Sequence, residues 1–306
     1  MMKWRGLFAP PPVPDSANAG SPAGKMPDFV VIGAQKAGTT WLFDNLVGQE
    51  DVWLPPSKEI HYFDNLWPDS HLFATLRERM QEELNKQDCD YGELLWRARL
   101  AFVRPRDDAW YASLFAPAGE RLAGDITPAY SLLDEAAVAR AHSIMPHAKI
   151  IFIMRDPIDR IWSHFCFSRS WIAKGLNDSE LTEAFAIAEM ESAAYDLRTR
   201  YLRTLRHWEA CFPPGQMLTL FYDDIALNPK RVLEDVHRFI GARKPLRLEE
   251  SRLANRSNET SYVTRLPGVD RHFARKYIAD IEALAGRFGG YPAQWLERAK
   301  ALAERR

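Results

Sequence analysis

The stretch that decides the fold is FVVIGAQKAGTTW, residues 29–41. Its four leading apolar residues predict a buried strand and residues 39–47 predict a helix, so Gly33 and Gly38 bracket the turn between them. Backbone N–H groups in such a turn, together with the positive end of the helix, form an anion site. The alternative is an ordinary structural turn, but the strand before it and the helix after it favour the anion site.

The spacing of the two glycines matches the Walker A loop, G-x-x-x-x-G-K-[ST], of nucleotide-binding proteins. However, Thr39 stands at the lysine position, and the lysine of this loop is Lys36. A kinase or ATPase also needs an acidic Mg²⁺ ligand at the end of a neighbouring strand. The clearest strand pattern, 149–154, is followed by Arg155, which puts a cation there instead. The sequence therefore disfavours a metal-dependent kinase, and we expect no metal site.

Short apolar runs alternate with helical patterns along the rest of the chain. We predict further strands at 124–126, 149–154 and 217–221, and helices at 132–145, from 157 onward, within 182–212 and at 228–240. Strands that lack polar alternation and are separated by helices indicate a parallel sheet covered on both faces. The expected fold class is α/β with a central parallel sheet and helical insertions at 70–115 and 165–212.

The domain organisation follows from composition. The chain has 306 residues, of which 46% are hydrophobic and 26% charged, the balance of a globular protein. Residues 10–27 contain six prolines among alanine, serine and glycine. Such a segment cannot bury enough apolar surface to order itself. We therefore predict a disordered tail at 1–27 and one domain at 28–306 with a helical C-terminal end.

Charge and cysteine usage exclude several classes of protein. Forty Lys and Arg residues balance 41 Asp and Glu residues, so the chain has no overall field for nucleic acid. Three widely spaced cysteines form neither a disulfide framework nor a metal cluster. No apolar run approaches the roughly 20 residues of a membrane helix, and the first residues lack the apolar region of a signal peptide. We expect a cytoplasmic protein without an integral membrane segment, and the oligomeric state is left open.

A second anion site is predicted by RDPIDRIWSHF, residues 155–165. Arg155 follows the strand at 149–154, at the edge where open α/β sheets bind ligands. Ser163 lies about two helical turns further on. A guanidinium and a hydroxyl together suit a phosphate monoester. An Arg-Asp-Pro helix start is commonly structural, but two anion motifs in this order, each after a strand, are far more specific.

These motifs resemble those of sulfotransferases that use 3′-phosphoadenosine 5′-phosphosulfate (PAPS). QKAGTTW is similar to their 5′-phosphosulfate loop, and RDPIDRIWS to their 3′-phosphate motif R-[DN]-P-x-x-R-x-x-S. The variant looks more like the Golgi heparan-sulfate enzymes and their bacterial relatives than the cytosolic phenol and steroid enzymes. The resemblance implies a P-loop-like three-layer fold, PAPS as co-substrate, adenosine 3′,5′-bisphosphate as product, and no metal.

The resemblance also assigns donor-binding roles. These fall on Gln35, Lys36, Ala37, Gly38, Thr39, Thr40 and Trp41 in the loop, and on Arg155 and Ser163 in the second motif. Lys36 is also expected to stabilise charge on the leaving phosphate. We expect Arg160 to form a structural ion pair and Trp162 to lie in the core.

The general base is sought in PPSKEIHYF, residues 55–63. This segment resembles K-E-x-x-[FY]-F of heparan-type sulfotransferases, which implies Glu59 as the base that takes the acceptor's proton. His61 is the competing base, because its ordinary pKa lies near neutrality and, in an extended segment, it points the same way as Glu59. Lys58 is either a solvated residue or a cation beside the transferred sulfuryl oxygens.

Two further segments are similar to less specific family features. GDITPAY, residues 124–130, resembles a substrate-side segment and is expected near the acceptor. Asn255, Arg256 and Ser257 occupy the place of the late loop that closes over the nucleotide, although the glycine- and lysine-rich form of that loop is absent.

The function we expect is transfer of a sulfuryl group from PAPS to a hydroxyl or amine of an acceptor. A glycan, a lipid or a small metabolite all remain open as acceptors. One alternative is a P-loop kinase or NTPase, which would require Mg²⁺. Another is a non-catalytic nucleotide-binding module, which would have no need of the base.

Overall fold

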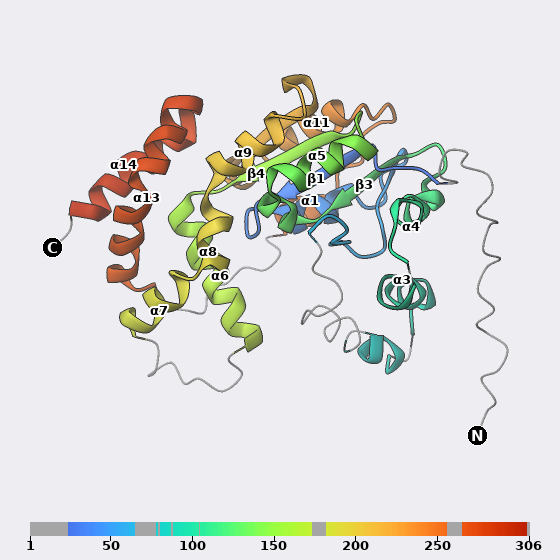
Figure 1. Ribbon diagram of the computed structural model, residues 1–306, viewed down its shortest axis with the longest axis horizontal. Coiled ribbons are helices and arrows are strands. Elements are labelled where there is room, and N and C mark those ends of the chain that lie inside the picture. Colours follow the sequence, from blue (N-terminus) through green and yellow to red (C-terminus); the bar gives the residue numbers. More distant parts are fainter. Residues whose placement is uncertain are drawn as a thin grey trace.

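The computed structural model describes residues 24–64, 78, 80–86, 88–103, 105–172, 182–255 and 265–304. In this part of the chain, five parallel strands form one sheet in the order β2-β3-β1-β4-β5 (Figure 1). The strands are β1 (Phe29–Gly33), β2 (Val52–Trp53), β3 (Leu122–Ile126), β4 (Lys149–Met154) and β5 (Met217–Phe221). The predicted parallel sheet is therefore confirmed.

The central strand is fully enclosed. All five residues of β1 are buried, and Val30 lies opposite Asp125 of β3 on one side and Ile150 of β4 on the other. Burial on both faces explains why β1 and β4 read as uninterrupted apolar runs. The short strand β2 was not predicted, because two residues are too few to show the apolar pattern that indicates a strand.

The helices of the described residues are α1 (Thr39–Leu46), α3 (Tyr91–Phe102), α4 (Asp108–Leu114), α5 (Glu135–Ile144), α6 (Pro157–Ile172), α7 (Glu183–Met190), α8 (Ala193–Asp196), α9 (Tyr201–Glu209), α10 (Tyr222–Leu227), α11 (Pro229–Ile240), α12 (Glu250–Ala254), α13 (Pro267–Phe288) and α14 (Gly290–Glu304). Short 3-10 helices are η1 (Ala116–Ala118), η2 (Pro128–Leu132), η4 (Leu197–Thr199) and η5 (Pro214–Gln216).

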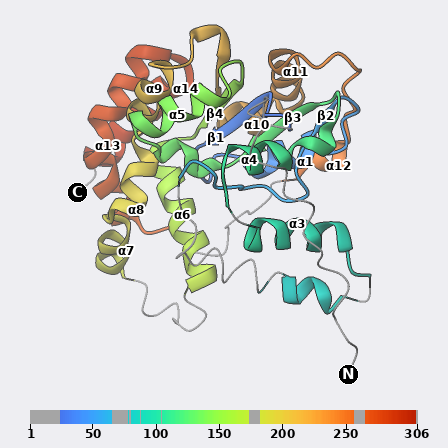
Figure 2. The same cartoon turned by 45° about the vertical axis from the view of Figure 1, so that its right-hand side comes forward.

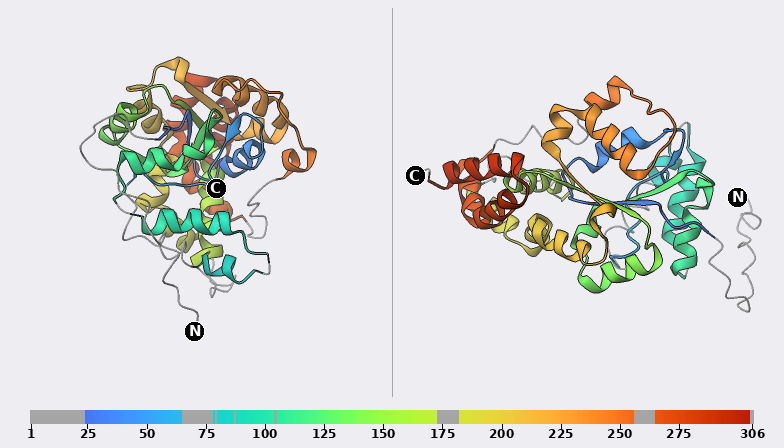
Figure 3. Two further views of the ribbon diagram at one scale, coloured as in Figure 1. Left: turned by 90° about the vertical axis from the view of Figure 1, so that its right-hand side faces the viewer. Right: turned by 90° about the horizontal axis from the view of Figure 1, so that it is seen from above.

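The helices cover both faces of the sheet and so make three layers. The view from above in Figure 3 shows α5 and α9 on one side of the sheet and α1, α11 and α12 on the other. The C-terminal pair α13 and α14 packs together at one end of the molecule, and the inserted helices α3 and α4 lie at the other (Figure 1). Helices α3 and α6 both extend below the sheet, as Figures 1 and 2 agree.

Two sequence predictions need adjustment. The helical region 182–212 is not continuous, because Ser192 and Arg200 leave helical backbone geometry and separate α7, α8 with η4, and α9. Of the predicted tail, residues 1–23 lie outside the described residues, whereas Pro27 is buried and Met26 packs against the core.

Within the described residues, no helix combines the length and the apolar character needed to cross a membrane.

Close packing around Gly124 of β3 gives a stability prediction. A Cβ at this position would lie 2.2 Å from Cζ of Phe29 and 2.7 Å from Cδ2 of Leu54. We expect Gly124→Ala to lower the free energy of unfolding by roughly 1–3 kcal/mol, because the core cannot yield without strain. The measurement is urea unfolding. The control is Gly215→Ala, where an added Cβ meets no atom within 4 Å. Equal stability of the two variants would contradict this packing argument.

Candidate active site

The predicted residues of the two anion motifs and of the base segment lie on stretches that follow β1, β2 and β4, at the carboxyl edge of the sheet where open α/β sheets bind ligands. The loop after β1 is tied to β4, since the Ala34 N–H donates to the Ile153 carbonyl (2.8 Å). Nη1 of Arg155 donates to the carbonyl of Lys36 (3.1 Å). The segment of the predicted base is tied to the end of β3 by the N–H of Glu59. These bonds bring three separate stretches of sequence to one place.

The loop after β1 has the backbone expected of an anion site. Gly38 precedes α1 with a φ of 97°, a left-handed value that favours glycine. A Cβ there would also lie 2.9 Å from Cδ1 of Ile225 and 3.2 Å from Cδ2 of Tyr222, both on α10. Ala37 and Thr39 beside it are buried. The predicted strand, turn and helix are confirmed, and the first N–H groups of α1 lie at the edge of the sheet.

Three cations converge on this loop. Burial, followed by the charges of Arg155 and Lys58, lowers the pKa of Lys36 to about 8. The Lys36 ammonium lies 4.3 Å from the ring centroid of Phe167, and the Arg155 guanidinium lies 4.6 Å from that of Tyr222. The charges of Lys58 and Arg155 repel that of Lys36, as the lowered pKa of Lys36 reflects. A bound anion would relieve this repulsion.

Lys58 is not simply a solvated residue. Its Nζ donates to Oγ1 of Thr40 at 2.5 Å and lies 3.5 Å from Oε1 of Glu59. It therefore links the first turn of α1 to the segment that carries the predicted base.

Glu59, His61 and Asp64 form a row of charged side chains. Nε2 of His61 lies 3.4 Å from Oε2 of Glu59, and its Nδ1 lies 2.6 Å from Oδ2 of Asp64. Burial alone would lower the pKa of His61, but the two carboxylates outweigh it and raise the pKa to about 9. Burial would likewise raise the pKa of Glu59, but His61 and Lys58 lower it to about 2. At neutral pH the imidazole is protonated and Glu59 is ionised.

The side chains of Glu59 and His61 point toward each other, but the prediction of an extended backbone that would point them the same way is wrong. The segment is not extended, because Glu59 and His61 have left-handed φ values of 71° and 56°. Backbone of this kind is costly for residues other than glycine and persists only where the surroundings hold it.

The second motif is placed as expected, with one correction. Ser163 lies buried on α6, and Trp162 is in the core. Arg160 makes no ion pair among the described residues. It is fully buried and donates to the carbonyl of Tyr195 (3.1 Å) and to Oγ1 of Thr199 (2.7 Å). The aspartates next to it in sequence are paired instead with Arg298 of α14.

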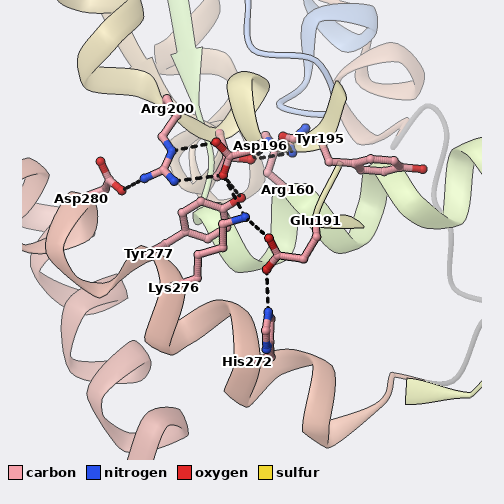
Figure 4. A network of polar contacts seen from close by, with 10 residues as sticks. Arg160, Glu191, Tyr195, Asp196, Arg200, His272, Lys276, Tyr277 and Asp280 are labelled. Atoms are coloured by element: carbon pink, nitrogen blue, oxygen red, sulfur yellow. Dashed lines mark hydrogen bonds and ion pairs between the residues drawn. The ribbon is translucent and has the colours of Figure 1, made fainter. Parts of the chain in front are cut away.

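Figure 4 shows how the C-terminal helices support this motif. Asp196 of α8 accepts bonds from Arg200 (3.0 Å) and from the hydroxyl of Tyr277 (3.1 Å). It also pairs with Lys276 (3.1 Å), which in turn reaches Glu191. This network fastens α8 and η4 to α13, and α8 and η4 provide the acceptors for Arg160.

The side chain of Trp41 packs toward α12. It is buried, and the indole N–H donates to the carbonyl of Leu253 (3.1 Å), which holds α12 against α1. Asn255 follows α12 and is exposed, while Arg256 and Ser257 lie outside the described residues. Gln35 is in the loop as predicted, and its Oε1 is buried without a hydrogen-bond partner in the described part of the chain.

Sequence reasoning missed two residues of the site. Asp64 contacts His61 three positions earlier, but an irregular segment has no period that would predict this contact. Tyr222, against which Arg155 packs, directly follows β5. Its position at the carboxyl end of a predicted strand was the signal that could have identified it.

Comparison with known proteins identifies the family, since residues 26–267 match the sulfotransferase domain. The chain belongs to the sulfotransferase family. Among curated relatives, human bifunctional heparan sulfate N-deacetylase/N-sulfotransferase 3 is 28% identical over 227 residues, covering 71% of this chain and 22% of the relative. The corresponding Drosophila melanogaster enzyme is 30% identical over 113 residues, covering 35% of this chain and 11% of its own. This sulfotransferase thus spans about a fifth or less of the length of these relatives.

Solved structures agree on the fold. A sulfotransferase from Alicyclobacillus acidocaldarius superposes with a TM-score of 0.57 at 20% identity, covering 88% of this chain and 98% of that one. The sulfotransferase domain of the Synechococcus PCC 7002 olefin synthase gives 0.50 at 21% identity, covering 79% and 83%. The P-loop-like three-layer fold expected for this sulfotransferase is confirmed, and the kinase alternative is not favoured.

The raised pKa of His61 predicts a pH dependence of the sulfotransferase's stability. The folded protein holds the His61 proton up to about pH 9, above the ordinary value of 6.5. The stabilisation is therefore complete below about pH 6.5 and is lost as the pH rises through about 9. Urea unfolding of His61→Gln across this range should show a flatter pH dependence than the wild type, whereas His147→Gln, which removes an exposed histidine, should not. An unchanged slope in His61→Gln would contradict the charged pair.

Proposed function

We propose that this protein transfers the sulfuryl group of PAPS to a hydroxyl or amine of an acceptor and releases adenosine 3′,5′-bisphosphate. The observation that carries the proposal is the cation cluster of Lys36, Lys58 and Arg155 directly beside the ionised carboxylate of Glu59. An anion-binding loop alone would suit many nucleotide-binding proteins. A carboxylate held against it is what proton removal from an acceptor requires.

The residues of the loop fit a donor with two anionic ends. Gly38 lets the loop pack against Ile225 and Tyr222 more closely than a Cβ would allow, and an anion would relieve the repulsion around Lys36. We assign the 5′-phosphosulfate to the loop N–H groups with Lys36 and Thr40, and the 3′-phosphate to Arg155 and Ser163. Donor-binding roles for Gln35, Ala37, Thr39 and Trp41, and the roles of Asn255, Arg256 and Ser257 in covering the nucleotide, stay predictions.

The proposed reaction is a single in-line displacement. The acceptor oxygen or nitrogen forms a bond to sulfur, the bond from sulfur to the 5′-phosphate oxygen breaks, and the acceptor's proton passes to Glu59. Lys36 and Lys58 stabilise the negative charge that develops on the oxygens. His61 is protonated already, so it orients Glu59 and does not take the proton.

The low pKa of Glu59 sets the timing of proton transfer. A carboxylate with a pKa of about 2 is too weak a base to ionise a free hydroxyl. An acceptor oxygen becomes strongly acidic only as its bond to sulfur forms. Proton transfer on this proposal is therefore concerted with, or follows, bond formation.

The acceptor class follows from the relatives. The human relative is named as a heparan sulfate N-sulfotransferase, and an amine or hydroxyl of a glycan is accordingly the first acceptor to test. Lipid headgroups and small metabolites with the same groups complete the panel. The cytoplasmic location expected from the sequence stays a prediction.

Donor binding is tested with Arg155→Ala. Removing one charge-assisted ligand of the 3′-phosphate should weaken binding of adenosine 3′,5′-bisphosphate by about 2–3 kcal/mol, measured by calorimetry. AMP lacks the 3′-phosphate, so its affinity should change little and serves as the internal control. Unchanged bisphosphate affinity in the folded variant would remove Arg155 from the site. A Mg²⁺ requirement for binding would favour the kinase.

The base is tested with Glu59→Gln, which keeps the shape of the side chain but removes its proton acceptor. We expect kcat to fall by roughly 10²–10⁴-fold while affinity for adenosine 3′,5′-bisphosphate is unchanged. The matched control is Glu50→Gln, an exposed carboxylate on the same chain whose loss should leave kcat unchanged. Near-wild-type turnover of Glu59→Gln beside an inactive His61→Asn would transfer the base role to His61.

A further inference from the structure

A buried carboxylate that no step of the proposed reaction uses lies behind the candidate base. Asp125 of β3 is fully buried. Its Oδ1 accepts from the hydroxyl of Thr127 (2.7 Å), and its Oδ2 accepts from the hydroxyls of Tyr111 (2.8 Å) and Tyr130 (3.1 Å). Burial raises its pKa to about 6 against the effect of these three donors, so it remains a carboxylate at pH 7. Burying a charged carboxylate is costly unless hydrogen bonds compensate it, and here three hydroxyl donors do so.

The direction of these hydrogen bonds determines which further bonds the hydroxyls of Thr127 and Tyr130 can make. A hydroxyl has one proton to donate, and Thr127 and Tyr130 both give theirs to Asp125. Their lone pairs are therefore free to accept. Oγ1 of Thr127 accepts from the N–H of Ile60 (2.9 Å), and the Tyr130 oxygen accepts from the N–H of Tyr62 (2.9 Å).

The amides of Ile60 and Tyr62 lie on either side of His61 in the sequence, and Ile60 directly follows Glu59. The N–H of Glu59 itself donates to the carbonyl of Ile126 (2.9 Å). The strained stretch, with left-handed φ at Glu59 and His61, is thus tied to the end of β3 and the residues after it through three of its own amides. Left-handed backbone at residues other than glycine persists only where such ties over-determine it.

We propose that Asp125 is a positioning residue for the Glu59–His61 pair, acting through the hydroxyls of Thr127 and Tyr130. This inference rests on the proposed function, because it names how the candidate base is held. A carboxylate is suited to the task since it only accepts hydrogen bonds, which forces both hydroxyls to turn their lone pairs toward the Ile60 and Tyr62 amides. An asparagine at this position would donate through its side-chain amide, so one of the two hydroxyls would have to accept that bond and could no longer donate to position 125.

The chain offers a matched pair of variants. Tyr111 and Tyr130 are both fully buried and both donate to Oδ2 of Asp125, but of the two it is Tyr130 whose oxygen accepts from the N–H of Tyr62. We expect Tyr130→Phe to lower kcat at least tenfold with unchanged affinity for adenosine 3′,5′-bisphosphate, and Tyr111→Phe to lower it less than threefold. A role limited to core stability would affect both variants alike.

A second measurement reports on the position of His61 and does not depend on enzyme activity. The pKa of His61, followed by NMR titration of its imidazole, should stay near 9 in the wild type and in Tyr111→Phe. In Tyr130→Phe it should fall toward 6.5 as His61 moves away from the carboxylates of Glu59 and Asp64. If Tyr130→Phe does not fold, Thr127→Val replaces it, with Thr127→Ser as the conservative variant that should restore the wild-type pKa and kcat.

The two readouts separate the two proposals. No sulfuryl transfer by the wild type to any acceptor of the panel would overturn the proposed function, and the His61 titration would still decide the positioning role. Transfer by the wild type, with the same kcat and the same His61 pKa in Tyr130→Phe and Tyr111→Phe, would overturn the positioning role alone. A low kcat and a lowered His61 pKa confined to Tyr130→Phe would support both.

Discussion

The close approach of the loop after β1 to the end of β4 is the constraint on which the candidate site depends. One bond runs from the Ala34 amide to Ile153, and a second runs from Arg155 back to the Lys36 carbonyl. Because the two strands are neighbours and parallel, residues more than a hundred positions apart reach the same edge of the sheet.

Charge is unevenly distributed at this edge. Lys36, Lys58 and Arg155 lie close together, while the carboxylates of Glu59 and Asp64 are largely engaged with protonated His61. The loop therefore carries excess positive charge, and water solvates this charge poorly because the loop is half-buried. On the proposed function, a donor with two anionic groups would neutralise this charge and so stabilise the folded protein.

The sequence predicted the strands better than the contacts that hold the candidate site. Uninterrupted apolar runs were enough for the strands, whereas the two anion sites stay predictions. The left-handed backbone of Glu59 and His61 could not be read from non-glycine residues, although their side chains were expected to point the same way. Arg160 was expected to form an ion pair, yet it donates to Tyr195 and Thr199, and the carboxylate of Asp156 pairs with Arg298, 142 positions away. Contacts at such separations are set by topology, which local patterns do not contain.

The bond from the Trp41 indole to the Leu253 carbonyl has a consequence for dynamics. Helix α1 starts at the loop after β1 and packs along its side against α12. The side chain of Asn45 on α1 adds a second bond, to the carbonyl of Arg252 on α12 (3.3 Å). Local opening of α12 therefore loosens α1, whose first turn follows the loop after β1. On the proposed function, a donor bound at this loop would raise the free energy of opening α12 by the amount by which that opening weakens donor binding.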